Sequence, residues 1–440
     1  MKTKSKRFKR IRNLVVLSSI WMVFLSVSTY AWFIGMKTVN VTRFDIDIAT
    51  TEGLFLSMDG KSWSYKLDAK NAAAYTGNTN TWAEDGLIPV STVGDMDPTS
   101  SRMILFEKGS LTATTGGYRL LASRVDNYSA SASGDGSLTQ GKGYVAFDLF
   151  IKNLSGNEYY VENNELNEEA IYLTTNSKVT VADAGGVANT GIENSVRVAF
   201  AQVGRVVGTT GEDQVNDITG ITCADSNVDG HARVTGICRS AQIWEPNDTV
   251  HVQNAINWYN TSCLTRKEDG TTVHVAGSYN TAKCTTITTT NLEGAETPTY
   301  AISRVIGVND NVNIYDGARY NTYAGNTAKY ATYTAAIKDK TGSELTTAKE
   351  DYKLVEYPYF TDTMKDIAGA DRPQFMTLAP NSITKVRVYI FIEGQDIDNY
   401  DFASLGKKIS VNFGFTKERY TEDDVDYEGP STDITPTTAE

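Results

Sequence analysis

GYVAFDLFIKN, residues 143–153, is the stretch of this 440-residue chain with the clearest β-strand pattern. Successive side chains of an extended strand point to opposite faces of a sheet, so residues two apart share a face. The bulkiest apolar side chains of this stretch recur at every second position: Val145, Phe147, Leu149 and Ile151. The side chains between them form a second, mixed face. The stretch therefore predicts a strand with one face in a hydrophobic core.

Strands of the same character are predicted on both sides of this one. They are AIYLTTNSKVTVAD (170–183), NSVRVAFAQVG (194–204), NSITKVRVYIFIEG (381–394) and KKISVNFGFT (407–416). The chain is also rich in Thr, Val, Ile and Tyr, which are enriched in strands, and no helical pattern alternates with these stretches. This combination predicts an all-β protein, with antiparallel strands packed as a jelly-roll-like β-sandwich.

A further strand is predicted near the N-terminus, in KTVNVTRFDIDIAT (37–50), with one irregularity. Val39 and Val41 share a face, whereas the next apolar set falls on the other parity: Phe44, Ile46 and Ile48. A bulge or bend near Thr42 and Arg43 would bring both sets to one face of the strand.

The first 36 residues predict export across a membrane. Residues 1–13 carry seven basic and no acidic side chains, and residues 14–36 carry no charge. This is the order of a secretory signal, whose basic flank stays in the cytoplasm. Cleavage after Ala31 is predicted, with Thr29 at the minus-three position. The apolar run is also long enough for an uncleaved signal anchor, so the protein is expected outside the cell or at the cell surface.

The charge balance bears on possible partners. The whole chain has a formal net charge of −12, and the part beyond residue 36 is more acidic still because it lacks the seven basic residues. Such a surface repels phosphate backbones, so nucleic-acid binding is not expected.

Five segments follow from composition and pattern. They are a signal peptide or anchor (1–36), the first part of the sandwich (37–205), an insertion or second lobe that holds all the cysteines (206–370), the final sandwich strands (371–420) and a disordered acidic tail (421–440). Within the first part, EGLFLSMDGKSWSY predicts a hairpin that turns at Asp59-Gly60, and residues 66–142 are expected to be mostly loops and edge elements.

The four cysteines fall within one region of about 60 residues: Cys223, Cys238, Cys263 and Cys284. An exported chain meets oxidising conditions, so two disulfides are expected. Three pairings are open, and the preferred one joins Cys223 to Cys238 and Cys263 to Cys284, because each bond would close a short loop. A zinc site is the alternative, but its usual C-x-x-C spacing does not occur.

One motif points to a metal ion. Asp225, Asn227 and Asp229 match the first half of a calcium loop, D-x-N-x-D-G. Calcium needs six to eight oxygens, and the acid that usually closes the loop at position 12 is replaced here by Gly236. A plain Asp/Asn/Gly turn, stapled by Cys223 and Cys238, is the preferred interpretation, and calcium is the alternative. No other cofactor is predicted.

Signs of catalysis are sparse, and the chain is not expected to be an enzyme. It has three histidines and none of the common hydrolase or nucleotide-binding motifs. Paired acids of a glycosidase could be formed by Glu393, Asp396 and Asp398, although a solvated turn explains them as well. Four tryptophans could line a carbohydrate groove instead of packing in the core: Trp63, Trp82, Trp244 and Trp258.

Four stretches in this order resemble the TasA and camelysin class of exported Gram-positive proteins. They are STYAWF after the apolar segment, EGLFLSMDGKSW, YVAFDLFIKN with its F-x-x-x-x-K-N pattern, and VRVYIFIEGQDIDN. The resemblance covers about a third of the chain in pieces. This chain is longer than the simple fibre subunits and has four cysteines and a large middle region that they lack. No metal-ligand set for proteolysis is found, so a protease activity is not carried over.

The resemblance implies a subunit of extracellular matrix or biofilm fibres. In some members the N-terminal strand of one copy fills the sheet of the next, which here would be Trp32 to Thr50 with Phe44, Ile46 and Ile48 buried. The first hypothesis is therefore an exported, self-associating structural protein. A membrane-anchored or secreted adhesin that binds a carbohydrate or host ligand is the second, and a secreted hydrolase is the third.

Overall fold

The computed structural model describes residues 40–48, 53–69, 86–92, 94–114, 117–124, 143–181, 191–208, 214–228, 231–251, 253–254, 264–266, 272–274, 286–288, 296–298, 306–308, 341–344, 354–356, 359–394, 396, 398–399 and 408–419. The predicted export segment (1–36) and acidic tail (421–440) lie outside these residues. Within the described residues there is no helix long and apolar enough to cross a membrane.

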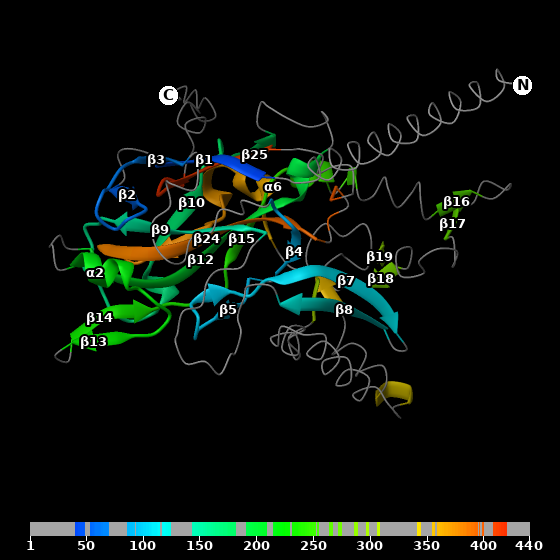
Figure 1. The fold of residues 1–440 in the computed structure, drawn as a ribbon, viewed down its shortest axis with the longest axis horizontal. Helices are drawn as coiled ribbons and strands as arrows, with labels where there is room; N and C mark the ends of the chain where they lie inside the picture. Colours follow the sequence, from blue (N-terminus) through cyan, green and yellow to red (C-terminus); the bar gives the residue numbers. More distant parts are fainter. Residues whose placement is uncertain are drawn as a thin grey trace, which may run out of the picture.

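Two sheets that share a hydrophobic core contain most of the described strand residues (Figure 1). The six-stranded sheet contains β1 (Asn40–Ile48), β3 (Lys66–Ala69), β10 (Glu169–Leu173), β11 (Lys178–Val181), β23 (Met376–Leu378) and β25 (Lys408–Thr416). The eleven-stranded sheet contains β2 (Leu54–Ser57), β4 (Pro89–Ser91), β7 (Phe106–Thr114), β8 (Gly117–Arg124), β9 (Val145–Asn153), β12 (Val196–Val207), β13 (Ser226–Val228), β14 (His231–Gly236), β15 (Gln242–Glu245), β22 (Phe360–Thr361) and β24 (Ser382–Glu393).

The remaining elements are short. Four two-stranded pairs are formed by β5 (Met96–Asp97) with β6 (Arg102–Met103), β16 (Leu264–Arg266) with β17 (Thr272–His274), β18 (Thr286–Thr288) with β19 (Glu296–Pro298), and β20 (Ile306–Val308) with β21 (Leu354–Glu356). The helices with assigned bounds are α2 (Gln214–Thr219), α6 (Asp362–Lys365) and three 3₁₀ turns at Glu165–Asn167, Ile192–Ser195 and Gly369–Asp371. The described part is therefore mostly β-sheet, as the sequence predicts.

The centre of the larger sheet is the antiparallel trio β9, β24 and β12, with β24 in the middle. Every residue of β9 and β24 is buried. The face of β9 predicted to be apolar lies in the core between the two sheets, which confirms the alternation: Val145, Phe147, Leu149 and Ile151. The opposite face is buried too, because Ala146 and Phe150 join a second core beneath residues 90–105 and 218–243. A sheet covered on both faces explains why these strands read as almost continuous apolar runs.

The sheets are mixed rather than purely antiparallel, which corrects the predicted pairing. Three neighbouring pairs run parallel: β1 with β25, β4 with β24 and β15 with β22. Hairpins impose antiparallel pairing only on strands that a tight turn connects. β1 and β25 lie at opposite ends of the chain, so no turn dictates their relative direction.

The larger sheet continues beyond residue 205, the predicted end of the first part of the sandwich. β12 continues to Val207, and β14 and β15 pair with it, so residues up to 245 belong to the larger sheet. The chain also returns to this sheet before residue 370, because β22 pairs with β15. Much of the segment between residues 255 and 353 lies outside the described residues. Strands near both limits of the predicted insertion (206–370) therefore pair within the larger sheet, and the insertion itself stays a prediction.

The stretch 66–142 contains more strand than predicted. β7 and β8 form a long hairpin that joins the larger sheet through β4. The predicted turn at Asp59-Gly60 is confirmed: Leu56 bridges to Ser64 across it, and Gly60 adopts a φ of 71°. Asp59 Oδ1 holds the turn by accepting hydrogen bonds from the backbone nitrogens of Lys61 and Ser62, both at 2.8 Å.

Candidate functional site

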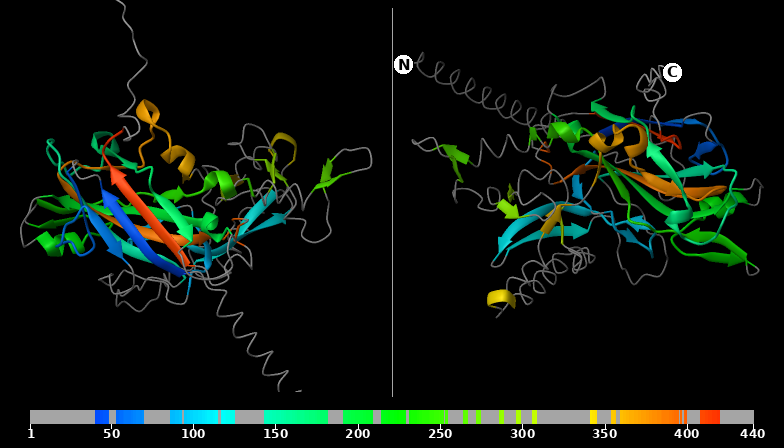
Figure 2. Two further views of the ribbon diagram at one scale, coloured as in Figure 1. Left: turned by 90° about the horizontal axis from the view of Figure 1, so that it is seen from above. Right: turned by 180° about the vertical axis from the view of Figure 1, so that it is seen from behind.

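The N-terminal strand β1 lies inside the six-stranded sheet of its own chain. It pairs in parallel with β25 from Asn40 to Ile48 and antiparallel with the shorter β3. Figure 2 shows β1 in blue running beside β25 in red along the same direction. The strand predicted to mediate assembly is therefore seated between two neighbours, and β25 is its main partner.

The change of parity in β1 is accommodated by the predicted bulge. The pairing with β25 shifts register between Val41 and Arg43, at Thr42. As a result Val41 and Ile46 both point into the core shared by the two sheets. In a strand without a bulge, two residues an odd number of positions apart would point to opposite faces. Phe44 and Ile48 lie in the strand, but their side chains are outside the described part of the structure.

The strand against which β1 pairs, β25, is strongly apolar on its core face. β25 contributes four fully buried side chains to the core: Ile409, Val411, Phe413 and Phe415. Phe200 of β12 packs edge-on against Phe413 and Phe415, with ring centroids 5.0 Å and 5.7 Å away. Edge-to-face aromatic contacts of this kind add to the gain from burial. The strand beside β1 is therefore fixed by packing against the larger sheet.

Removing β1 would create an open edge on β25. β10 and β11 pair with β25 along its other side, so the side facing β1 has no second partner strand among the described residues. Unpaired backbone N–H and C=O groups on such an edge bind another strand readily. The position of β1 is thus one that a second copy of the strand could occupy.

A second cluster of chemically active side chains lies at the ends of β12, β15 and β24, around Arg197. Arg197 is completely buried, and its Nη2 lies 2.6 Å from Asp396 Oδ2 and 3.3 Å from Glu245 Oε1. His251, on a helical turn at 248–251, is also completely buried, with Nε2 3.5 Å from Glu245 and Nδ1 3.5 Å from Asp396. His251 is thus enclosed between two carboxylates.

The cluster shifts the pKa values of its members. Burial raises the pKa of Asp396 to about 7, against the opposing effect of Arg197. Burial alone would lower the pKa of Arg197, but Asp396 and then Glu245 raise it above its ordinary value. Asp398, which accepts hydrogen bonds from Asn254 at 3.1 Å, also has a raised pKa because of burial. These groups bind to one another and hold together the ends of several strands.

Stability should therefore depend on pH through Asp396. In the unfolded chain its carboxyl has a pKa of about 3.9, whereas the native state keeps the proton up to about pH 7. The native state binds more protons between these values, so the free energy of unfolding should rise as the pH falls from 8 to 6, by at most about 1.4 kcal/mol per pH unit. Urea unfolding at pH 8, 7 and 6 measures this slope. Asp396→Asn should flatten it, and a wild-type chain without the slope would contradict the assignment.

The acids considered above as a glycosidase pair or a solvated turn are buried. Glu393 is completely buried; it accepts hydrogen bonds from Ser91 Oγ at 2.6 Å and Tyr359 OH at 3.3 Å. Asp396 is engaged by Arg197. Ser91 and Tyr359, which contact Glu393, and Arg197, which contacts Asp396, are themselves buried. A structural role accounts for these contacts.

The predicted disulfide between Cys223 and Cys238 is confirmed. It ties the segment before β13 to the end of β14, and no side chain fits at Gly236 because the Cys223 carbonyl lies against it. The bonded pair cannot serve as zinc ligands. Cys263 and Cys284 lie outside the described residues, so their pairing stays a prediction.

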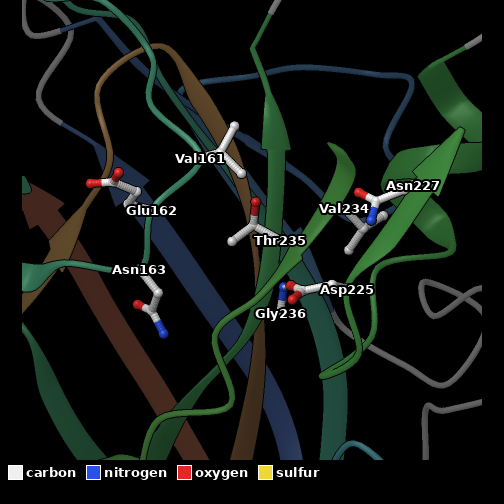
Figure 3. A pocket seen from close by; sticks show the side chains of 8 residues that line it. All are labelled: Val161, Glu162, Asn163, Asp225, Asn227, Val234, Thr235 and Gly236. Atoms are coloured by element: carbon white, nitrogen blue, oxygen red, sulfur yellow. Dashed lines mark hydrogen bonds between the residues drawn. The ribbon is translucent and has the colours of Figure 1, made fainter. Parts of the chain in front are cut away.

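The predicted calcium residues border a pocket of about 310 Å³ (Figure 3). Asn227 lies in β13 and Asp225 directly precedes that strand; Asp225 Oδ1 accepts a hydrogen bond from the Gly236 nitrogen at 2.8 Å. The carboxylates of Glu162 and Asp225 lie at opposite sides of the pocket in Figure 3. Asp229 lies outside the described residues, and among the residues described no three His, Cys, Asp or Glu side chains gather as a metal site. Calcium stays a prediction.

The tryptophans that the structure describes do not form a shared groove. Trp244 is completely buried in the main core, and its Nε1 donates a hydrogen bond to Asp362 at 2.8 Å. Trp63 is half-buried and packs against the second core, with Lys152 Nζ 4.9 Å from its ring centre. Trp82 and Trp258 lie outside the described part of the chain.

Sequence reasoning missed the partners of the Arg197 cluster. Arg197 and Asp396 are 199 residues apart, and His251 and Glu245 come from a third segment. The available signal was weak: a single Arg within an otherwise apolar strand pattern, VRVAFA. A buried charge requires a partner, but spacing alone does not identify it.

Comparison with family models, curated proteins and solved structures finds no match to this chain. The function is therefore inferred from its own residues, their geometry and their chemistry. The resemblance to the TasA and camelysin class stays a prediction from four short stretches.

Proposed function

We propose that this chain is an exported structural protein of the cell surface or extracellular matrix, whose copies join by exchanging β1. In each junction, β1 of one copy would occupy the place between β25 and β3 of the next. This is domain exchange of a terminal strand, which creates no new contact type and therefore costs little in equilibrium terms. Repeated from copy to copy, the exchange produces a fibre, because each chain both gives and receives one strand.

The observation that carries this proposal is the pairing of β1 with β25 and the burial of its apolar side chains. β1 is the first strand that the structure describes, pairs along its length with β25, and buries Val41 and Ile46 in the core. The side of β25 that it covers is continuous with the buried Phe413 and Phe415. A strand of this kind can be replaced by an identical strand from another chain without any change in the packing beneath it.

Export fits the same role. The basic segment followed by an uncharged run of 23 residues predicts that the rest of the chain lies outside the cytoplasmic membrane. Cleavage after Ala31 would free the chain shortly before β1, whereas an uncleaved anchor would leave it attached to the membrane. The disulfide between Cys223 and Cys238 is the kind of bond that persists in an oxidising compartment.

The second candidate function is a secreted or membrane-anchored ligand-binding module. The pocket beside Asp225, Asn227 and Asn163 favours it, because amide and carboxylate groups next to Val161 and Val234 suit a small polar ligand such as a sugar. Glycan-array binding by the secreted chain, lost on Asn227→Ala with the fold intact, would support this function.

Electron microscopy tests the assembly proposal directly. The chain beginning at Trp32 should form filaments at neutral pH as its concentration rises, and deletion of residues 32–50 should abolish them. A synthetic peptide of residues 38–50, which contains β1, should bind the deleted chain and cap it as single particles. The same peptide with Ile46→Asp is the matched control, because a charged side chain cannot enter the core.

Two results would contradict the proposal. One is a full-length secreted chain that stays as uniform single particles at every concentration tested. The other is a deleted chain that still assembles, since an interface independent of β1 would then hold the filament together.

A further inference from the structure

A lysine, an asparagine and a glutamate meet at the ends of three strands from different parts of the chain. Lys417 Nζ donates a hydrogen bond to Asn153 Oδ1 at 3.0 Å and lies 2.8 Å from Glu169 Oε2. Asn153 Nδ2 donates to the same Glu169 oxygen at 2.9 Å. One carboxylate oxygen thus contacts both the amine of Lys417 and the amide nitrogen of Asn153.

The three strands hold this geometry firmly. Asn153 is the last residue of β9 in the larger sheet, and its backbone is paired with β2 and β24 on either side. Glu169 begins β10, and Lys417 follows the last residue of β25, both in the smaller sheet. The contact therefore bridges the two sheets of the fold at one end.

The amide of Asn153 is fixed and screened from water. Asn153 is completely buried, and its Nδ2 also donates to the Ala379 carbonyl at 3.0 Å. Lys417 Nζ also donates a hydrogen bond to the Leu154 carbonyl at 3.3 Å. The side chains of Lys417 and Glu169 are 21% and 20% exposed, so a small product can leave the site.

Glu169 is in the right state to take a proton. Burial by itself would raise its pKa, but hydrogen bonds from Lys417, Ser155 and Asn153 lower it below the ordinary value. The carboxylate is therefore ionised at neutral pH and lies within hydrogen-bond reach of the Lys417 ammonium. Its second oxygen is held by Ser155 Oγ and by Asn157 Nδ2, so the reacting oxygen keeps its orientation.

We propose that Lys417 and Asn153 join through an intramolecular amide bond, formed in the folded chain with Glu169 as the proton carrier. Glu169 Oε2 takes a proton from the Lys417 ammonium, and the neutral Nζ attacks Cγ of Asn153. Glu169 then returns the proton to Nδ2, the Cγ–Nδ2 bond breaks, and ammonia leaves as the Nζ–Cγ amide forms. Nζ gives up its second excess proton to the departing ammonia, which leaves as ammonium, so no oxidant, cofactor or second substrate is required.

Proximity makes this otherwise slow exchange feasible. An amine held against an amide by a rigid fold reacts as an intramolecular partner, with effective concentrations of about 10⁵ M or more in favourable geometries. Only one turnover per chain is needed, so the reaction has the lifetime of the protein in which to finish. The leaving group, ammonia, is small, and the new amide forms a covalent bridge between the sheets.

The bond would act on the strand that receives β1. Lys417 lies directly after β25, so an amide to Asn153 ties the end of β25 to the centre of the larger sheet. Tension applied along the chain could then not peel β25 away from the core. This inference stands on the three side chains alone and holds whether or not β1 is exchanged.

Mass spectrometry of the secreted full chain tests the proposal. After reduction of the disulfides, the intact denatured chain should weigh one ammonia less than its sequence requires. A tryptic digest should yield one branched peptide in which Lys417 is linked to Asn153. The branched peptide is decisive, because cyclisation of an asparagine onto its own backbone loses the same mass but leaves the Lys417 peptide free.

Matched variants separate the roles of the three residues. Lys417→Arg and Asn153→Ala should abolish the branched peptide and the mass loss. Glu169→Gln keeps the size of the side chain but cannot carry the proton, so the bond should be lost or form many times more slowly. Lys408→Arg, at the exposed opposite end of β25, should leave the bond intact.

The wild-type chain alone can overturn the proposal. Recovery of unmodified Lys417 and Asn153 peptides from correctly folded protein, after prolonged storage, would show that the three groups form an ordinary ion pair and hydrogen-bond network. Full bond formation in Glu169→Gln would overturn the role given to Glu169, while the bond itself would stand.

Discussion

Arg197→Met should lower the free energy of unfolding by about 3–5 kcal/mol, the largest effect expected for a single substitution in this chain. Methionine preserves most of the volume and apolar stem of the arginine, so packing changes little. What is lost is the positive charge 2.6 Å from Asp396 and 3.3 Å from Glu245, both of them buried. Two carboxylates would then remain in the interior without their cation.

The size of this effect comes from desolvation. Both acids are removed from water, and an uncompensated buried charge is far more costly than a lost surface contact. Asp396 can relieve part of the cost by taking a proton, since burial already raises its pKa to about 7. The loss of stability should therefore be smaller at pH 6 than at pH 8.

Urea unfolding of Arg197→Met beside Arg233→Met measures the difference. Arg233 is 46% exposed and lies 3.5 Å from Asp217, so its removal should cost less than about 1 kcal/mol. Equal losses in the two variants would show that the Arg197 cluster contributes no more than a surface pair.

Local pattern was enough to predict the central strands. β9, β12 and β24 each bury side chains on two faces, and their apolar periodicity identifies them without any knowledge of their neighbours. The bulge at Thr42 was predictable for the same reason, since a change of parity within one strand has few other solutions. The short loop between Cys223 and Cys238 likewise made that disulfide the simplest pairing.

Pairing between distant segments was not predictable from one sequence. Nothing in residues 40–48 indicates that they run parallel to residues 408–416, because strand direction is set by the global path of the chain. The same holds for Asn153, Glu169 and Lys417, which look like ordinary polar residues at strand ends. The calcium motif did not predict the β13–β14 hairpin for a related reason. Asp, Asn and Gly occur both in turns and in metal-binding loops, so the motif does not distinguish the two.

A disulfide between β1 and β25 should block assembly completely, and this is the sharpest test of strand exchange. Asp45 and Asn412 are direct partners in the parallel pairing, on the face away from Val411 and Phe413. Paired strand residues lie within the Cα distance that a disulfide spans. In Asp45→Cys/Asn412→Cys, oxidation before assembly should lock β1 into its own chain and leave single particles.

The order of oxidation and assembly gives the opposite result in the same variant. If filaments form first in mild reductant and are then oxidised, the new disulfides join neighbouring copies and should appear as a ladder on a denaturing, non-reducing gel. Asp45→Cys/Lys408→Cys is the matched control. Its second cysteine is displaced by four residues along β25, roughly 13 Å, so neither product should form.

Wild-type chains treated with the same reductant control for loss of the bond between Cys223 and Cys238. The proposal would be contradicted if chains locked by oxidation still formed filaments and ran as monomers on the gel. Assembly would then not require β1 to leave its own sheet. Single particles before reduction and a covalent ladder after assembly would instead support pairing of β1 of one chain with β25 of another, because Asp45 and Asn412 are direct partners in that pairing.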